Sequence, residues 1–202
     1  MKICVFGAAS NNIDAVYTQT AYAFARHLAD RGHSLVFGAG KDGMMGAAAK
    51  GFTDGKAEVV GVIPHFFDDF AVEVKYPACT QLIYTETMRE RKAKMEELAE
   101  AFVITPGGIG TFEEFFEVLT LKQLGRHKKP IAIYNMNGYY NELQAMMENA
   151  IAQNFLYEQC RDIYMISESA DEIIDYLEND EELELTLYEL KTGSSKPEEE
   201  NG

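Results

Sequence analysis

Three glycines in the segment TPGGIGTFEE, residues 105–114, could hold a phosphate group. Gly107, Gly108 and Gly110 stand between an apolar run and an acidic, helix-like run. Glycine allows a ligand to approach backbone N–H groups closely, and the first turn of a helix offers unpaired N–H donors and a partial positive charge. The segment therefore predicts a phosphate-binding turn at the start of a helix.

The two acids that follow this turn allow either a structural or a chemical role. Thr111 and Glu114 have the T-x-x-E spacing of a capping box, in which a hydroxyl and a carboxylate satisfy two N–H groups at a helix start. Glu113 could serve in place of Glu114, or could complement the helix dipole. Spacing alone leaves capping and chemistry equally open for both acids.

Two cations interrupt an apolar helix face upstream of the glycines. In ETMRERKAKMEELA, helical spacing puts Arg91 and Lys92 on one face with Met88 and Met95. Lys92 alone could pack its aliphatic stem and extend its amine to water. A buried guanidinium without a partner is strongly destabilising, so Arg91 predicts a fixed anion close by. That anion could be an acidic helix, a ligand phosphate or both.

The elements that must position these residues alternate regularly along the chain. Short runs that are apolar throughout indicate parallel strands covered on both faces, and the segments between them have helical periodicity. The sequence predicts strands at residues 2–6, 34–37, 58–63, 81–85, 101–105, 130–134 and 162–166, and helices at residues 12–31, 43–54, 86–99, 111–124, 138–152 and 169–178.

This alternation predicts a Rossmann-like, doubly wound α/β fold with a mainly parallel sheet of about seven strands. We expect one nucleotide-binding catalytic domain over residues 1–179. Residues 180–202 are acidic and contain TGSSKPEEENG, so we expect a partly disordered tail.

Three glycine-bearing loops follow predicted strands, and in a parallel sheet such loops meet at one edge. They are FGAASN, FGAGKDGMMG and TPGGIGT. The second loop also fits GxGxxG, with Glu58 placed 20 residues beyond Gly38 as in a dinucleotide fingerprint. However, it follows the second strand, and Glu58 would begin a strand where the fingerprint acid ends one, so a mononucleotide is favoured over NAD.

Composition limits the classes of binding partner and the cellular compartment that we expect for the protein. The net charge of −15 argues against a nucleic-acid backbone as the partner, because phosphate-tracking proteins carry a basic face. The apolar run after Lys2 is too short to span a membrane. Cys4, Cys79 and Cys160 lack metal-ligand spacing, so we expect reduced thiols, a cytoplasmic location and no metal site.

Several motifs together resemble a known family. MRERKAKM, PGGIGTFEE and LTLKQLG are similar to the R-K-x-x-M plus PGGxGTxxE signature of the LOG-type proteins, which are also labelled lysine decarboxylase-like. The resemblance extends through FGAGKDGMMG and GVIPHFF. It implies a homodimer with its active site near the interface. It also implies hydrolysis of the N-glycosidic bond of AMP or N6-substituted AMP, with free base and ribose 5-phosphate as products and no metal or organic cofactor.

The resemblance implies roles for individual residues. Arg91 and Glu114 match the family's catalytic pair, and Lys92 accompanies Arg91 at the ligand. Ile109, Leu121 and Ala39 depart from the residues most frequent at these positions in the family. We expect the substrate or phosphate contacts at Ser10, Gly40, Gly43, Met44, Glu73, Gly107, Gly108, Ile109, Gly110, Thr111, Phe112, Glu113 and Thr120.

A mechanism follows for the implied reaction. Cleavage of the C1'–N bond builds positive charge on the ribose, and the Glu114 carboxylate would stabilise it and orient or deprotonate water. Arg91 would hold the substrate and keep Glu114 ionised. Two alternatives stay open: a non-catalytic nucleotide or cofactor carrier on the same fold, and a pyridoxal-phosphate-dependent lysine decarboxylase with Lys128 as its Schiff-base lysine.

Overall fold

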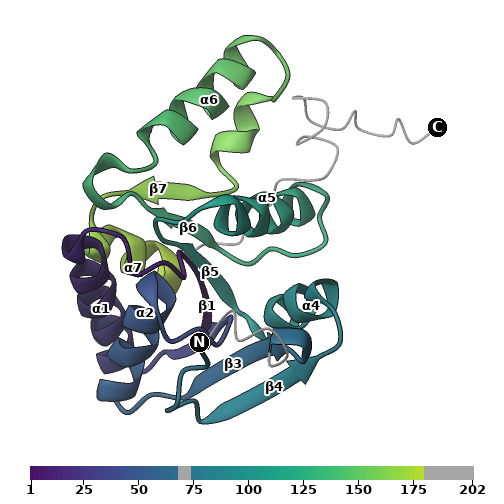
Figure 1. Cartoon of the computed structure of the whole chain (residues 1–202). Coiled ribbons are helices and arrows are strands. Elements are labelled where there is room, and N and C mark those ends of the chain that lie inside the picture. Colours follow the sequence, from purple (N-terminus) through teal and green to yellow (C-terminus); the bar gives the residue numbers. More distant parts are fainter. Residues whose placement is uncertain (68–73, 180–202) are drawn as a thin grey trace.

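The computed structural model describes residues 1–67 and 74–179 (Figure 1). Glu73 and the predicted acidic tail lie outside the described residues. The strands are β1 (Lys2–Phe6), β2 (Ser34–Phe37), β3 (Val59–Pro64), β4 (Gln81–Thr85), β5 (Ala101–Ile104), β6 (Ile131–Tyr134) and β7 (Met165–Ser167). The α-helices are α1 (Ala15–Asp30), α2 (Gly43–Asp54), α4 (Met88–Leu98), α5 (Ile109–Gln123), α6 (Asn141–Ala152) and α7 (Ala170–Asn179).

The strands form one seven-stranded sheet in the order β4-β3-β2-β1-β5-β6-β7, and every pair of neighbours is parallel. The prediction of a doubly wound parallel sheet of about seven strands is confirmed. Chain order runs outward in both directions from the centre, so the strand order reverses between β1 and β5. Ligands of such sheets bind beyond the carboxyl ends of the strands at this reversal.

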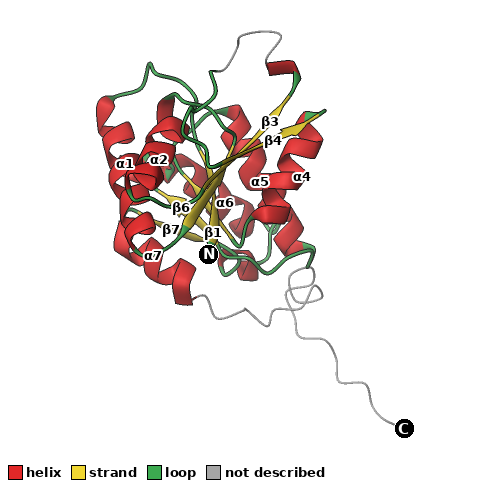
Figure 2. Ribbon diagram, turned by 90° about the horizontal axis from the view of Figure 1, so that it is seen from below, coloured by secondary structure: helices red, strands yellow, loops and turns green. Residues whose placement is uncertain are grey.

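Helices cover both faces of the sheet (Figures 1 and 2). Helices α1, α2 and α7 pack on one face, and α4, α5 and α6 pack on the other. Strand β1 shows how one short run serves both layers, because successive side chains of a strand point to opposite faces. Ile3 and Val5 join the first core cluster, whereas Cys4 and Phe6 join the second.

The start of α5 differs from the prediction. The helix begins at Ile109 with Gly108 as its N-cap, two residues before the predicted start at Thr111. Thr111 therefore lies within the first turn and is buried, with its side chain packed against Gly107. The capping-box interpretation of Thr111 and Glu114 is wrong, because a residue inside the helix cannot act as its N-cap.

Candidate active site

A cleft of about 370 Å³ opens at the carboxyl ends of β1 and β5, where the strand order reverses. It brings together the loop after β1, the turn at the start of α5 and one residue each from α2 and α4. Its lining residues are Gly7, Ala8, Ala9, Ser10, Met45, Arg91, Gly108, Gly110, Thr111 and Glu114. The two predicted catalytic residues thus face one cavity with the predicted phosphate-binding turn.

Packing within the turn requires glycine at one of its three glycine positions but not at the other two. A Cβ at Gly108 or Gly110 would meet no described atom within 4 Å, and neither residue has a positive φ. A Cβ at Gly107 would lie 2.1 Å from the Thr111 hydroxyl oxygen, so packing requires that glycine. Neither conformation nor packing within the described residues requires Gly108 and Gly110 to be glycine. The remaining reason is close access to the backbone at the N-terminus of α5.

The Arg91 guanidinium is held by backbone carbonyl oxygens. Arg91 is only 6% exposed. Its Nε donates to Val62 O at 3.1 Å and its Nη2 donates to Gly38 O at 2.9 Å. A Cβ on Gly38 would lie 1.7 Å from Nη2, so this glycine leaves the room that the guanidinium occupies. Among the described residues no carboxylate pairs with Arg91, so none of them supplies the fixed anion expected from the sequence.

The Glu114 carboxyl is in an environment that disfavours its charge. Burial raises the pKa of Glu114 to about 7, with the positive charge of Arg91 acting in the opposite direction and the neighbouring Glu113 adding to the rise. The charge of Arg91 favours the ionised form of Glu114, as expected, but desolvation outweighs this attraction and leaves the pKa above its ordinary value. Near neutral pH this carboxyl exchanges readily between its two protonation states, as a general base or acid requires.

Lys92 and Glu113 contact each other and are absent from the cleft lining. Lys92 Nζ on α4 binds Glu113 Oε1 and lies 2.7 Å from Glu117 Oε2, both on α5. Thr120 is exposed, more than one turn beyond Glu114 along α5, and is also absent from the lining. Ile109, at the helix start, is 87% exposed.

The loop between β2 and α2 packs against the loop after β1, which lines the cleft. Met44 N–H donates to Ala8 O at 2.8 Å, and Gly43 N–H donates to Asn11 Oδ1 at 3.1 Å. Gly43 has φ of 61°, and a Cβ there would lie 2.4 Å from Ala8 O. Gly40 forms an isolated bridge with Lys75. Gly43 and Met44 thus position the loop after β1, whereas Gly40 pairs with Lys75 instead. Met45, which the sequence did not single out, lines the cleft.

Two tyrosines that the sequence analysis missed fix the glycine turn. Tyr139 Oη donates to Gly107 O at 2.7 Å, and Tyr140 Oη donates to Thr105 O at 2.8 Å. Both follow β6, whose carboxyl end lies at the same edge of the sheet. Their signal is the polar GYYN stretch that follows the apolar strand. Tyr139 also borders an apolar pocket of about 220 Å³, which adjoins the cleft at Ala8, Ser10 and Gly108.

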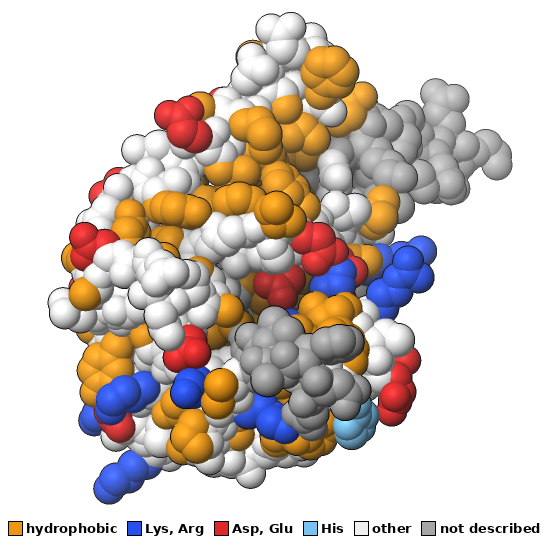
Figure 3. All heavy atoms as spheres, in the orientation of Figure 1, with side chains coloured by type: hydrophobic (Ala, Val, Ile, Leu, Met, Phe, Trp, Pro, Cys, Tyr) orange, Lys and Arg blue, Asp and Glu red, His pale blue; other side chains and the backbone are white. Residues whose placement is uncertain are grey.

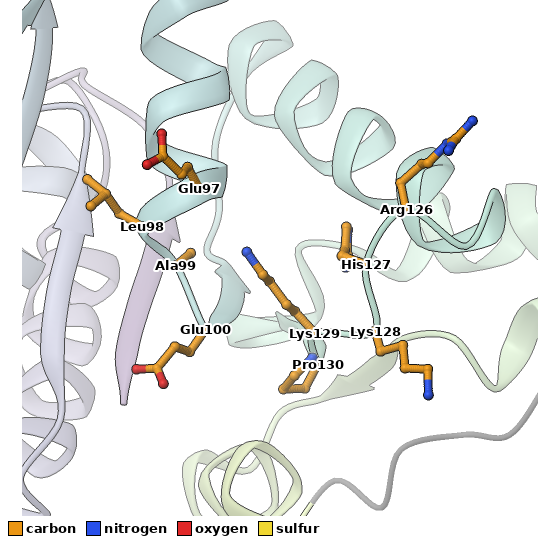
Figure 4. A pocket seen from close by; sticks show the side chains of 9 residues that line it. All are labelled: Glu97, Leu98, Ala99, Glu100, Arg126, His127, Lys128, Lys129 and Pro130. Atoms are coloured by element: carbon orange, nitrogen blue, oxygen red, sulfur yellow. The ribbon is translucent and has the colours of Figure 1, made fainter.

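A larger hollow of about 660 Å³ lies at the opposite edge of the sheet, before β5 and β6 (Figure 4). Lys129 Nζ donates to Glu96 O at 2.6 Å and so completes the C-terminus of α4. Arg126 and Lys128 point away from Lys129 (Figure 4). Lys128, the lysine considered for a Schiff base, is therefore remote from Arg91 and Glu114.

Glu58, the acid of the dinucleotide-like spacing, also lies at that opposite edge. It immediately precedes β3 and pairs with Lys2 at 3.2 Å. A ribose-binding acid would have to lie at the carboxyl edge instead. In the described part of the chain, no three His, Cys, Asp or Glu side chains are grouped suitably for a metal ion. No helix within residues 1–67 and 74–179 is long and apolar enough to cross a membrane.

Comparisons with known proteins agree with these features. A family model described as "Possible lysine decarboxylase" matches residues 45–177. The chain is 36% identical over 177 residues to the probable cytokinin riboside 5'-monophosphate phosphoribohydrolase LOGL1 of Oryza sativa subsp. japonica, which covers 88% of this chain and 78% of that relative. It is 35% identical over 177 residues to cytokinin riboside 5'-monophosphate phosphoribohydrolase LOG2 of Arabidopsis thaliana, with 88% and 82% covered.

A solved structure has the same fold at much lower identity. The molybdenum cofactor carrier protein of Chlamydomonas reinhardtii has a TM-score of 0.67 and 19% identity, with 88% of this chain and 95% of that chain covered. At this identity the likeness concerns the arrangement of strands and helices alone.

Proposed function

The chain belongs to the LOG family of cytokinin riboside 5'-monophosphate phosphoribohydrolases, as its motifs predicted, and we propose that it hydrolyses the N-glycosidic bond of AMP or N6-substituted AMP. The products are the free base and ribose 5-phosphate. The proposal assigns the 5'-phosphate to the glycine turn and the reacting sugar carbon to the space between Arg91 and Glu114.

The observation that carries this proposal is the pair of glycines that the described structure does not itself require. Gly108 and Gly110 leave the backbone at the start of α5 open to the cleft, which Arg91 and Glu114 also line. A helix N-terminus with an open backbone favours an anion such as phosphate. Binding of that remote phosphate would hold the glycosidic bond at the carboxyl group.

Glu114 supplies the base in the proposed reaction. Its carboxylate accepts a proton from water while the water oxygen forms a bond to C1' and the C1'–N bond breaks. The departing nucleobase takes the bonding electron pair and the proton that Glu114 accepted from water, which returns the carboxyl group to its ionised form. The same carboxylate stabilises the positive charge that develops on the ribose in the transition state. A pKa of about 7 suits proton transfer at neutral pH.

Arg91 binds and orients the substrate. Its donors to Val62 O and Gly38 O fix the plane of the guanidinium, and its positive charge is retained because carbonyl oxygens are neutral partners. A fixed guanidinium attracts anionic oxygens of the substrate and favours the ionised form of the Glu114 carboxyl group.

The experiment that tests the function is incubation with AMP, adenosine and N6-isopentenyl-AMP, with products separated and identified chromatographically. We expect adenine and ribose 5-phosphate from AMP, and release from adenosine reduced at least about hundredfold because the remote phosphate is missing. Equal rates on adenosine would refute the phosphate assignment. Tight binding of AMP without cleavage would instead indicate a carrier. A visible aldimine band with pyridoxal phosphate and decarboxylation of lysine would indicate the decarboxylase.

We also propose that two copies of the chain associate as a homodimer. Hydrophobic side chains gather on the surface over α5 and α6 (Figure 3). The large exposed ones in this part of the sequence include Ile109 at 87%, Phe155 at 83% and Met146 at 52%. Patches of this kind mark protein interfaces. Light scattering after size-exclusion chromatography should give twice the mass of 22.7 kDa, and Phe155→Glu should shift it toward the monomer.

The proposed location is the cytoplasm. Cys4, Cys79 and Cys160 are all free thiols, and burial raises the pKa of each. Unpaired thiols of this kind are typical of proteins in a reducing compartment.

A further inference from the structure

Helices α4 and α5 both contribute residues to the cleft, and Lys92 joins the two helices. Lys92 Nζ on α4 contacts Glu113 Oε1 and lies 2.7 Å from Glu117 Oε2 on α5. The Lys92 side chain is only 13% exposed. Burial would lower its pKa, but the contacts with Glu113 and Glu117 raise it above its ordinary value. The amine is therefore held as a cation between two carboxylates.

Without the Lys92 cation, two neighbouring carboxylates of α5 would destabilise the helix. Glu113 and Glu117 are four residues apart, so they lie on the same side of the helix and repel each other. Glu96 of α4 adds a third acid, and its pKa is raised by burial and by the charge of Glu117. A nearly buried lysine between these acids replaces repulsion with attraction across the two helices.

The contact between Lys92 and α5 lies next to the candidate catalytic pair in the sequence. Lys92 directly follows Arg91, and Glu113 directly precedes Glu114, so the ion pairs join the two helices one residue away from each member of the candidate catalytic pair. The cleft lining includes Arg91 and Glu114 but, among the described residues, neither Lys92 nor Glu113. No direct ion pair joins Arg91 and Glu114 within the described residues, whereas Lys92 on α4 contacts both Glu113 and Glu117 on α5.

We propose that Lys92 is a positioning residue, which fixes Arg91 and Glu114 relative to each other through its ion pairs with α5, and that it does not bind the substrate phosphate. This inference rests on the proposed function. It changes the role that the family resemblance implies for Lys92 and for Glu113, which both become part of the link between α4 and α5.

The test compares Lys92→Met with the double variant Glu113→Gln/Glu117→Gln. We expect kcat for AMP to fall about tenfold in each, because small displacements of reacting groups are costly, while KM changes less than about threefold. Combining all three substitutions should cause no further loss, since both variants remove the same contacts. Lys94→Met is the matched control, because Lys94 pairs with Glu97 within α4 and should leave kcat unchanged.

A charge exchange separates positioning from substrate binding. In Lys92→Glu/Glu113→Lys/Glu117→Lys the link is restored with reversed charges, and kcat should recover relative to Lys92→Glu alone. If Lys92 binds the phosphate, the exchanged variant should stay inactive, Lys92→Met should raise KM and weaken the affinity for ribose 5-phosphate, and Glu113→Gln/Glu117→Gln should not reproduce these effects. That result would overturn the proposal.

The failure of the proposed function would be recognised separately. A wild-type protein that leaves AMP intact refutes the hydrolase assignment, and the link is then decided by thermal unfolding. Non-additive losses of Tm in the Lys92 and Glu113/Glu117 variants support it, whereas strictly additive or absent losses overturn it.

Discussion

At the scale of single residues, the environment of Glu114 predicts how the reaction depends on pH. The pKa of Glu114 is raised to about 7 by burial, and only the ionised carboxylate accepts a proton from water. Hydrolysis of AMP should therefore increase as the pH rises from 5 to about 7 and then level off. Initial rates at saturating AMP across this range measure the dependence. A rate that is already maximal at pH 5 would contradict the assignment of Glu114 as the base.

The same shift predicts an opposite effect on stability. A carboxyl whose folded pKa is raised binds its proton more tightly in the folded state, so stability decreases as the pH rises from about 4 to about 7. Glu114→Gln removes this cost and should be about 1–2 kcal/mol more stable than wild type at pH 8, after allowing for partial exposure. Its turnover should fall at least about hundredfold. Urea unfolding at pH 4 and pH 8 provides the comparison, and equal stabilities at pH 8 would contradict it.

The glycines of the turn offer a second test at this scale. Gly108→Ala and Gly110→Ala place a methyl group in open space, so the fold should be preserved while KM for AMP rises about tenfold or more because the backbone is obstructed. Gly107→Ala is the contrasting variant, because its Cβ would lie 2.1 Å from the Thr111 hydroxyl and should lower the thermal stability. Thermal melting and steady-state kinetics on the three variants separate the two effects. Unchanged KM in the first two would remove the phosphate from this turn.

At the scale of elements, the loop after β6 supports the loop after β5. Tyr139 donates to Gly107 O, so Tyr139→Phe removes one hydrogen bond from the turn without removing the ring. We expect about 1 kcal/mol weaker binding of ribose 5-phosphate, or about fivefold, and little change in Tm because Tyr139 is 42% exposed. Isothermal titration calorimetry measures the binding. Tyr140→Phe should instead lower Tm, since its hydroxyl partner Thr105 O is buried.

The elements themselves were largely predictable, and the contacts between them were not. Runs such as ICVF and AFVI are apolar throughout and too short for a buried helix, which favours strands covered on both faces, so the parallel sheet followed from sequence. The start of α5 was misplaced because T-x-x-E spacing resembles a cap even when a glycine precedes the helix. The partners of Arg91 could not be predicted, because they are backbone carbonyl oxygens. Every residue has one, so the sequence does not show which of them accept a hydrogen bond from the guanidinium.

At the scale of the whole molecule, ion pairs join the end of α7 to the segment that follows α1, within the layer formed by α1, α2 and α7. Glu178 at the end of α7 binds Arg31 and lies 2.8 Å from His33 Nε2, between α1 and β2. The side-chain hydrogen bond from Arg31 is the main cause that lowers the pKa of Glu178 to about 2. This acid therefore stabilises the fold above its ordinary pKa, and the contribution is lost as the pH falls from about 4 to about 2.

Glu178→Gln should accordingly lower Tm by a few degrees at pH 7, and the difference from wild type should vanish near pH 2. Calorimetric scans at the two pH values provide the measurement, with Glu168→Gln as a control on an exposed acid near β7. A difference that persists at pH 2 would show that the substitution acts through packing rather than charge.

The neutral carbonyl partners of Arg91 have a metabolic consequence. Because Val62 O and Gly38 O orient the guanidinium without cancelling its charge, small anions that enter the cleft compete with the nucleotide for the same attraction. Orthophosphate and released ribose 5-phosphate should thus act as competitive inhibitors, and turnover inside a cell would slow whenever these anions accumulate and resume as they are consumed.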